Sequence, residues 1–150
     1  MAAATFDGKD QVPQGRQQNA RRVELHYHID TNIIGDGTGL VAAETVEFGM
    51  LPAGYVHERL DGILRTAEGA AATVDIGTEA DPDGFMDGGN VNGTPNAKIA
   101  LAGTEAFAPG TYFHANTPVR LGPPGGAATL DDCIFDVTFV GYMVDTGSEK

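Results

Sequence analysis

The chain has little of several residue types on which common folds and sites depend. It contains one cysteine, Cys133, and no tryptophan, so an internal disulfide and paired-cysteine zinc or redox sites are excluded. Leucine and lysine are scarce, and no segment repeats its apolar residues with the helical period, so helices are not expected. No apolar run approaches the roughly 18 residues of a membrane-spanning helix. The N-terminus lacks the apolar segment of a signal peptide, so we expect a soluble protein made in a cytoplasm.

The residues that are abundant favour short strands joined by tight turns. The chain has 150 residues, which fits one domain, and includes 21 glycines and 8 prolines. Its apolar residues are mostly valine, isoleucine, alanine, phenylalanine and tyrosine in short runs, a composition typical of β structure. A domain of this length buries about 70% of the surface that its unfolded chain exposes, so it needs no metal or disulfide to support its core.

Acidic charge dominates the chain, and it is unevenly distributed. The net charge is −12, from 21 acids and 9 bases, and an acidic body repels phosphate. Nucleic acid and anionic membranes are therefore not expected as partners. Residues 1–22 hold four bases against two acids, a net charge of +2, so the remainder carries −14. A basic arm on an acidic body indicates that the two meet different surfaces, or that arms reach neighbouring copies. The alternative is an ordinary flexible N-terminus that is basic by chance.

The chain divides into an arm, residues 1–20, and a body, residues 21–150. The arm is rich in glutamine, asparagine, glycine and alanine, and cannot bury enough apolar surface to order by itself. We therefore expect an extended or flexible arm. The body begins with the clearest strand in the sequence, 21–30, in which four apolar residues alternate with four polar ones. These are Val23, Leu25, Tyr27 and Ile29 on one face, and Glu24, His26, His28 and Asp30 on the other.

The rest of the body reads as further strands separated by turn residues. We predict strands over 40–48, 55–66, 72–76, 97–102 and 132–144, with a glycine- and aspartate-rich loop over 77–93. A further strand begins at 112–113, and residues 118–121 either continue it or form the next one. Gly62 would mark a bulge in its strand. The last strand is apolar on both faces, so we expect it to be central in its sheet and covered on both sides. Together these strands predict an antiparallel β-sandwich, most simply of the jelly-roll type.

Three histidines could form a metal site. His26 and His28 are two apart on one strand face, a spacing that points both rings in one direction. His57 follows proline and glycine in a segment that resembles part of the second metal-binding motif of cupins, a family of jelly-roll proteins. The acid that should follow the first two histidines is missing, and Asp61 stands where cupins usually have asparagine. The competing interpretation is surface histidines on a polar face, so we predict no metal, cofactor or catalytic residue.

The segment from Asp81 to Asp87 alternates aspartate with glycine, which could supply oxygen ligands to calcium. It lacks the later glutamate and the flanking helices of an EF-hand, and both residue types are common in turns. Whether this loop binds calcium is left open by the sequence.

Motifs of hydrolases, nucleotide-binding loops and zinc proteases are absent. Cys133 lies in an apolar segment and is expected to be a buried small side chain. The sequence does not indicate an enzyme.

One long stretch resembles small structural virion proteins of tailed bacteriophages. Residues 51–54 read Leu-Pro-Ala-Gly, residues 71–88 read AATVDIGTEADPDGFMDG, and 112–119 read YFHANTPV before a final apolar strand. The resemblance covers roughly residues 48–145, and the virion proteins concerned are similar to capsid decoration, or cement, proteins. It implies a structural role on the outer surface of the head, with the major capsid protein as partner, and it supplies no catalytic residues.

The sequence therefore favours a capsid decoration protein, made in the bacterial host and bound to the virion. The arm lies outside the resemblance, and we expect its bases to contact the shell or a neighbouring copy: Lys9, Arg16, Arg21 and Arg22. A homo-oligomer is expected, and a trimer would suit three-fold lattice sites. A head-fibre base, tail or adaptor component is one alternative. A cupin-like metal-binding enzyme using the three histidines is the other.

Overall fold

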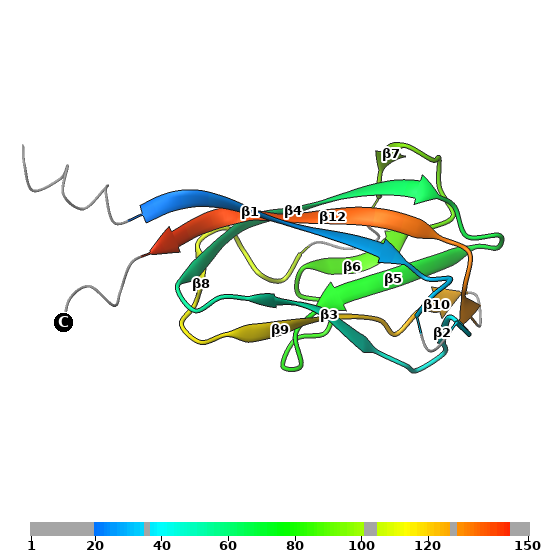
Figure 1. Ribbon diagram of the computed structural model, residues 1–150, viewed down its shortest axis with the longest axis horizontal. Helices are drawn as coiled ribbons and strands as arrows, with labels where there is room; N and C mark the ends of the chain where they lie inside the picture. The colour runs from blue at the N-terminus through cyan, green and yellow to red at the C-terminus, as the bar shows by residue number, and fades with distance from the viewer. Residues whose placement is uncertain (1–19, 35–36, 101–104, 127–128, 145–150) are drawn as a thin grey trace, which may run out of the picture.

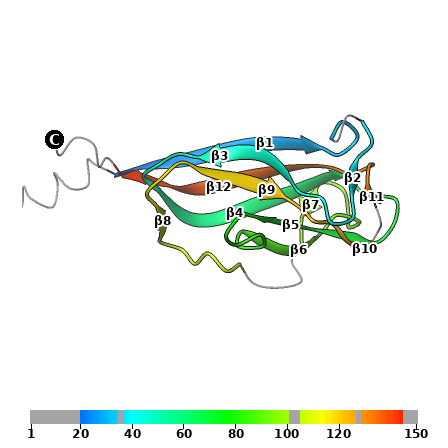
Figure 2. The ribbon, with the colours of Figure 1, turned by 90° about the horizontal axis from the view of Figure 1, so that it is seen from below.

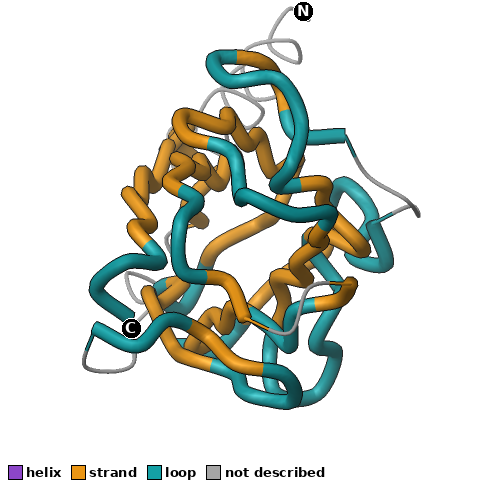
Figure 3. Tube along the Cα trace, turned by 90° about the vertical axis from the view of Figure 1, so that its right-hand side faces the viewer, coloured by secondary structure: helices purple, strands orange, loops and turns teal. Residues whose placement is uncertain are grey.

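The computed structural model describes residues 20–34, 37–100, 105–126 and 129–144, which are built of strands, turns and loops. These residues contain no helix (Figure 3), and hence none that could cross a membrane. The strands are β1 (Ala20–Asp30), β2 (Leu40–Val41), β3 (Val46–Leu51), β4 (Tyr55–Thr66), β5 (Ala72–Gly77), β6 (Met86–Asn90), β7 (Ala97–Lys98), β8 (Thr111–Phe113), β9 (Thr117–Leu121), β10 (Gly125–Gly126), β11 (Thr129–Leu130) and β12 (Ile134–Val144).

Two antiparallel sheets pack face to face, as the sequence predicted (Figure 1). The first, here called the β12 sheet, has the order β1-β12-β4-β7, with β8 also paired to β4. The second, here called the β5 sheet, has the order β10-β5-β9-β3, with β6 also paired to β5. The short strands β2 and β11 pair with each other outside both sheets. Because β1 and β12 are antiparallel neighbours, the start of β1 and the end of β12 lie side by side at one end of the sandwich.

The core lies between the sheets and is rich in aromatic rings. Alternation along β12 sends Phe135, Val137 and Phe139 inward, where each is fully buried. Phe85, from the loop before β6, packs edge-on against Phe139 at a ring separation of 5.0 Å. Burial of one such aromatic side chain contributes roughly 1.5–3 kcal/mol to stability, so these rings are central to holding the layers together.

The prediction for the last strand was half right. Strand β12 is central in its sheet, between β1 and β4, as expected. It is not covered on both faces, because its outward side chains Asp136, Thr138 and Tyr142 retain contact with solvent. The apolar residues that misled the prediction, Ile134 and Val140, are screened by neighbouring strands within the sheet itself.

Several other strand predictions can be checked against the structure. The bounds of β4 are those predicted, and β1 and β5 differ by one residue. The predicted strand 40–48 is instead two strands, β2 and β3, with a turn between them. The predicted loop 77–93 contains β6, and the strand predicted over 97–102 is described only as the two residues of β7. The bulge predicted at Gly62 is not there, because Gly62 pairs regularly with Val137. The register of β4 shifts instead on either side of it, beside Leu64 and beside Arg59.

Two edge strands lie on the same side of the sandwich, β1 of one sheet and β3 of the other (Figure 2). The phenol of Tyr27 reaches across from β1, donating to the carbonyl of Met50 at 3.2 Å and accepting from its backbone N–H at 3.3 Å. Gly49 makes room for this ring, since a Cβ there would lie 2.5 Å from it. Tyr27 therefore ties the two sheets together and occupies the backbone groups of β3 at Met50.

Candidate binding surfaces

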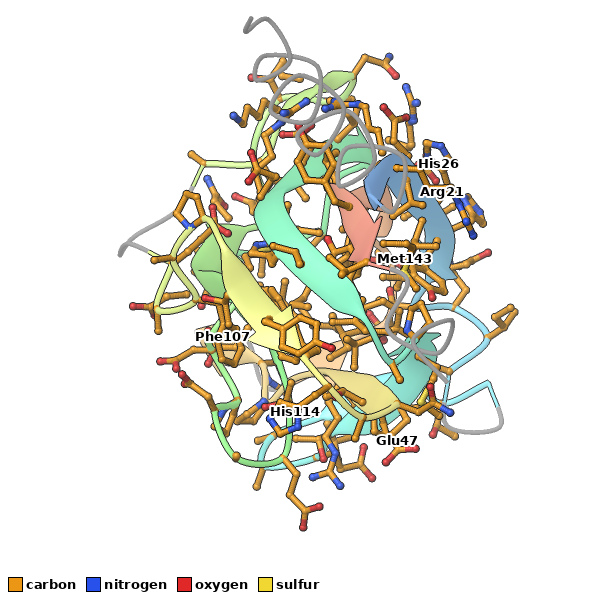
Figure 4. All side chains as sticks on the ribbon, turned by 90° about the vertical axis from the view of Figure 1, so that its left-hand side faces the viewer. Arg21, His26, Glu47, Phe107, His114 and Met143 are labelled. Atoms are coloured by element: carbon orange, nitrogen blue, oxygen red, sulfur yellow. The ribbon has the colours of Figure 1, made fainter. Side chains whose placement is uncertain are left out.

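The arm bases fall partly outside the described residues. Lys9 and Arg16 lie there, as does all of the predicted arm except Ala20, the first residue of β1. Arg21 and Arg22 are exposed on β1, where they pair across the strand with Met143 and Tyr142. They stand at the end of the sandwich where the described chain starts and finishes, which Figure 4 shows with Arg21, His26 and Met143 labelled. Any contact made by residues 1–19 therefore begins beside this end.

The outer face of the β12 sheet carries balanced charge. Pairing registers place its outward side chains in rows across β1, β12, β4 and β7. The charged ones include four bases, Arg22, Arg59, Arg65 and Lys98, and four acids, Glu24, Asp30, Asp61 and Asp136, and half-buried Glu58 stands at the register shift beside Arg59. His26 and His28 lie among them, beside a shallow hollow of about 510 Å³. This face is a polar, nearly neutral surface within a chain of net charge −12.

A bridging carboxylate joins three strands of this face. Asp136 on β12 accepts a hydrogen bond from Arg65 Nε on β4 at 2.7 Å, and its other oxygen lies 2.6 Å from His28 Nδ1 on β1. These hydrogen bonds, the one from Arg65 first, lower the pKa of Asp136 below its ordinary value. Arg59 similarly reaches Asp61 at 3.0 Å. The charges of the face are largely matched within the protein, so covering them with a partner leaves few unpaired.

One end of the face presents exposed tyrosines. A single row across the sheet runs from Arg22 through Tyr142 and Val56 to Tyr112. Tyr142 is 36% exposed and Tyr112 is 41% exposed. Tyrosine and arginine are, with tryptophan, the residues most enriched in the energetic centres of protein interfaces. The ring of a tyrosine can be buried while its hydroxyl group still finds a partner. This row is the best candidate on the described surface for protein contact.

The outer face of the β5 sheet is different, because its acids outnumber its bases. Outward positions on β3, β5 and β6 bring Glu47, Asp75 and Asp87, and the loop before β6 adds three more acids, Glu79, Asp81 and Asp83. Arg120 on β9 is the base among them, lying 3.5 Å from both Glu47 and Glu79. Burial, partly opposed by a hydrogen bond from Gly88, raises the pKa of Asp75, and Asp83 and Asp87 raise it further.

The three histidines considered for a metal do not converge. The side chains of His26 and His28 are 69% and 65% exposed on the outer face of the β12 sheet. His57 is fully buried on the inner face of the same sheet, so the expectation of a surface residue was wrong for it. Among the described residues, the group of ionisable side chains close enough to share a cation is Glu68, Asp131 and Asp132 instead. Glu68 is already engaged, because its carboxylate accepts the backbone N–H groups of Asp132 and Cys133.

His57 belongs to the aromatic core. Its ring contacts Phe85 at a centroid distance of 4.8 Å, and its two nitrogens lie 3.2 Å from the Tyr55 hydroxyl and 3.4 Å from Glu105. Burial raises the pKa of the Tyr55 phenol, with smaller contributions from Glu58 and Glu105. The sequence did contain an indication that His57 is buried, because it lies two residues from Tyr55 on one strand and therefore on the same face as that core residue. This polar group is satisfied inside the sandwich and is remote from the histidines of β1.

Cys133 is buried, as predicted, and its thiol is protected from reaction. Its side chain is fully inaccessible, with Thr31 Oγ1 lying 3.6 Å from the sulfur. Burial raises the pKa of the thiol to about 12, and Thr31 offsets this only in part. At neutral pH the side chain is therefore an uncharged thiol, which is a poor nucleophile and a poor metal ligand.

Comparisons with known proteins find one informative likeness. No family model matches the chain, and no curated protein matches it significantly. Among solved structures, the chain is similar to one described as "Cyanophage Pam1 capsid asymmetric unit". The match covers 83% of this chain and 85% of the other, with a TM-score of 0.53 and 20% sequence identity. At that identity the likeness concerns the fold, and it extends over nearly the whole of both chains.

Proposed function

We propose that this protein is a structural component of a bacteriophage virion, a non-enzymatic decoration protein bound to the outer surface of the capsid. The observation that carries the proposal is the fold similarity to a chain of a cyanophage capsid, because it spans most of both chains. The sequence resemblance over residues 48–145 points to the same class of protein. A cement protein acts by binding the assembled shell in preference to free subunits, which stabilises the shell by mass action.

The proposed fold type is a jelly roll, and the strand order supports it. Leaving out the two-residue strands, the chain runs β1, β3, β4, β5, β6, β8, β9 and β12. It crosses between the two sheets at every connection except the one from β5 to β6. Eight strands divided between two sheets by repeated crossing are what a double Greek key requires. Such a rigid body loses little conformational freedom when it docks, which favours binding to a lattice.

The proposed contact with the major capsid protein is the outer face of the β12 sheet, centred on the row from Arg22 to Tyr112. Three features support this choice: the charges are balanced, two tyrosines are exposed, and the arm begins at the same end. The arm bases Lys9, Arg16, Arg21 and Arg22 would extend the contact over the shell or a neighbouring copy. The acidic outer face of the β5 sheet would then face solvent, where repulsion opposes non-specific association.

Copy number tests the function directly. Quantitative mass spectrometry on density-banded virions of the phage that encodes this chain would compare its abundance with that of the major capsid protein. A ratio near one, or a simple fraction of one, is expected for decoration of the whole lattice. A few copies per particle would instead identify a head-fibre base, tail or adaptor component. Absence from particles would overturn the proposal of a virion protein.

Deletion of residues 1–20 tests the proposed arm separately from the body. The sandwich should keep its thermal unfolding midpoint, because the deletion removes only the first of the eleven residues of β1, Ala20, which is paired with Val144 at the end of the sheet. Binding of the truncated protein to undecorated shells, measured by co-sedimentation, should weaken. Light scattering on the same samples can test for the trimer that three-fold lattice sites suggest. Normal binding by the truncated protein would remove the arm from the proposal and leave the docking face as the contact.

A further inference from the structure

Strand β1 is an edge strand whose outer side has no partner strand among the described residues. Its pairing with β12 runs over eleven residues without a register shift, from Ala20 opposite Val144 to Asp30 opposite Ile134. It contains no proline and no bulge, two of the devices that prevent an edge from accepting another strand, and its charged side chains are of both signs, so a suitable register can pair them. The neighbouring edge strand β3 differs, because it has a register shift and Tyr27 bound to its Met50 backbone.

The orientation of the free backbone groups can be worked out from the register. Thr31 N–H donates to the carbonyl of Cys133 at 3.1 Å, directly beyond the end of β1. Backbone groups alternate sides along an antiparallel strand, so the odd-numbered residues of β1 face β12 and the even-numbered ones face away. The free N–H and C=O groups therefore belong to Arg22, Glu24, His26 and His28, while the carbonyl of Asp30 already accepts from Ile33.

We propose that β1 pairs with β1 of a second copy of this chain, antiparallel about a two-fold axis at His26, which joins the two β12 sheets into one. In this register Arg22 faces Asp30 of the other copy, and Glu24 faces His28. Each of these pairs occurs twice by symmetry. The charges of β1 are thus complementary to those of a second copy of β1 that runs in the opposite direction. A shift of the axis to Tyr27 would place Glu24 opposite Asp30, which is repulsive.

The apolar side of β1 supports the same partner. Val23, Leu25 and Tyr27 point inward yet are only partly buried, because the core stops at this edge. Met50 on β3, beside the same edge, is 48% exposed. A second β1 would place Leu25 opposite Tyr27 and Val23 opposite Ile29 of the other copy, continuing the core across the junction. The pairing is compatible with a three-fold axis elsewhere on a lattice, where it would link neighbouring assemblies.

A disulfide can test this register, because the one native cysteine, Cys133, is buried and does not compete with an introduced cysteine. In the proposed register the two copies of residue 26 form a hydrogen-bonded pair, with Cα atoms about 5.5 Å apart, which suits a disulfide. The full-length variant His26→Cys should therefore form a covalent dimer rapidly under mild oxidation. The variants Glu24→Cys and His28→Cys should react slowly. Asp61→Cys is the matched control, because it is on the same face but about five strand spacings, roughly 24 Å, from its counterpart.

A charge exchange checks the register by a route that does not use oxidation. Arg22→Glu should weaken dimerisation by between about two- and thirty-fold in sedimentation experiments, because it creates two like-charge contacts. Adding Asp30→Lys to the same chain should restore it. The proposal is overturned if His26→Cys links no faster than Asp61→Cys, or if position 24 or 28 links fastest. Either failure would leave the proposed attachment to the shell untouched, since that is measured on virions.

Discussion

The outer faces of the two sheets differ in how their charges are matched. On the β12 sheet four bases face four acids, and the bridging carboxylate of Asp136 has partners on both adjoining strands. On the β5 sheet and the loop before β6, six acids accompany one base, Arg120, which lies close to two of them, Glu47 and Glu79. Both faces are polar, so their residue composition alone would not distinguish which of them is suited to binding a partner. The difference teaches that a face is suited to docking when covering it leaves few unpaired charges, and not simply when it is less polar.

The largest expected effect is on shell binding. Tyr142→Ala should weaken binding to undecorated shells by about tenfold or more, because a tyrosine at the energetic centre of an interface contributes about 2 kcal/mol or more. Co-sedimentation of the purified variant with shells measures this. Glu79→Ala is the matched control, since its side chain is 83% exposed on the acidic side of the molecule, and it should bind normally. Equal loss in both variants would break the distinction between the faces.

A smaller effect is expected on stability when the bridging carboxylate is neutralised. Asp136→Asn should lower the free energy of unfolding at pH 7 by about 0.5–1 kcal/mol, a value that allows for solvent screening of these half-exposed pairs. The pKa of Asp136 is lowered in the folded state, so its contribution is complete above the ordinary carboxyl pKa and is lost as pH falls through the lowered one. Denaturant melts of both proteins from pH 7 to pH 2.5 should therefore converge in acid. A constant difference would contradict the assignment.

The smallest effect should have the opposite sign. The pKa of Asp75 is raised, so its charged form opposes folding at neutral pH. Asp75→Asn keeps an oxygen to accept from Gly88 and should stabilise the protein by about 0.5 kcal/mol at pH 7. The gain should fade as pH drops through the raised pKa and vanish below about pH 3.8, the unfolded-state value. If the variant is destabilised at pH 7, the acidic face is better matched than its geometry indicates.

Sequence patterns predicted the fold well where alternation was strict. Strands β1 and β4 were placed almost to the residue, because their inward side chains are mostly apolar and their outward ones mostly polar or charged. Strand β6 was missed because Met-Asp-Gly-Gly-Asn has low strand propensity, and it forms through its pairing with β5. The burial of His57 was also missed, since a histidine is compatible with either face of a strand.

The candidate surface was the least predictable part. The sequence placed Glu24, His26, His28 and Asp30 correctly on the polar side of their strand. It could not show that Arg65, 37 positions beyond His28, meets the same carboxylate, because that depends on β12 lying between β1 and β4. Net charge is likewise a total over the whole chain, so it could not show that the two outer faces differ. Both features arise from pairing between strands that are distant along the chain.

The contact between Tyr27 and Met50 has a consequence for how copies of this protein can add to one another. An open strand edge is a template on which further chains can grow without limit. Here the phenol occupies the backbone N–H and C=O of Met50, so a strand arriving at β3 would have to displace it. Addition of a strand along that side is thereby discouraged. One hydroxyl group, admitted by a missing side chain at Gly49, thus protects this edge against the open-ended strand addition that builds fibres.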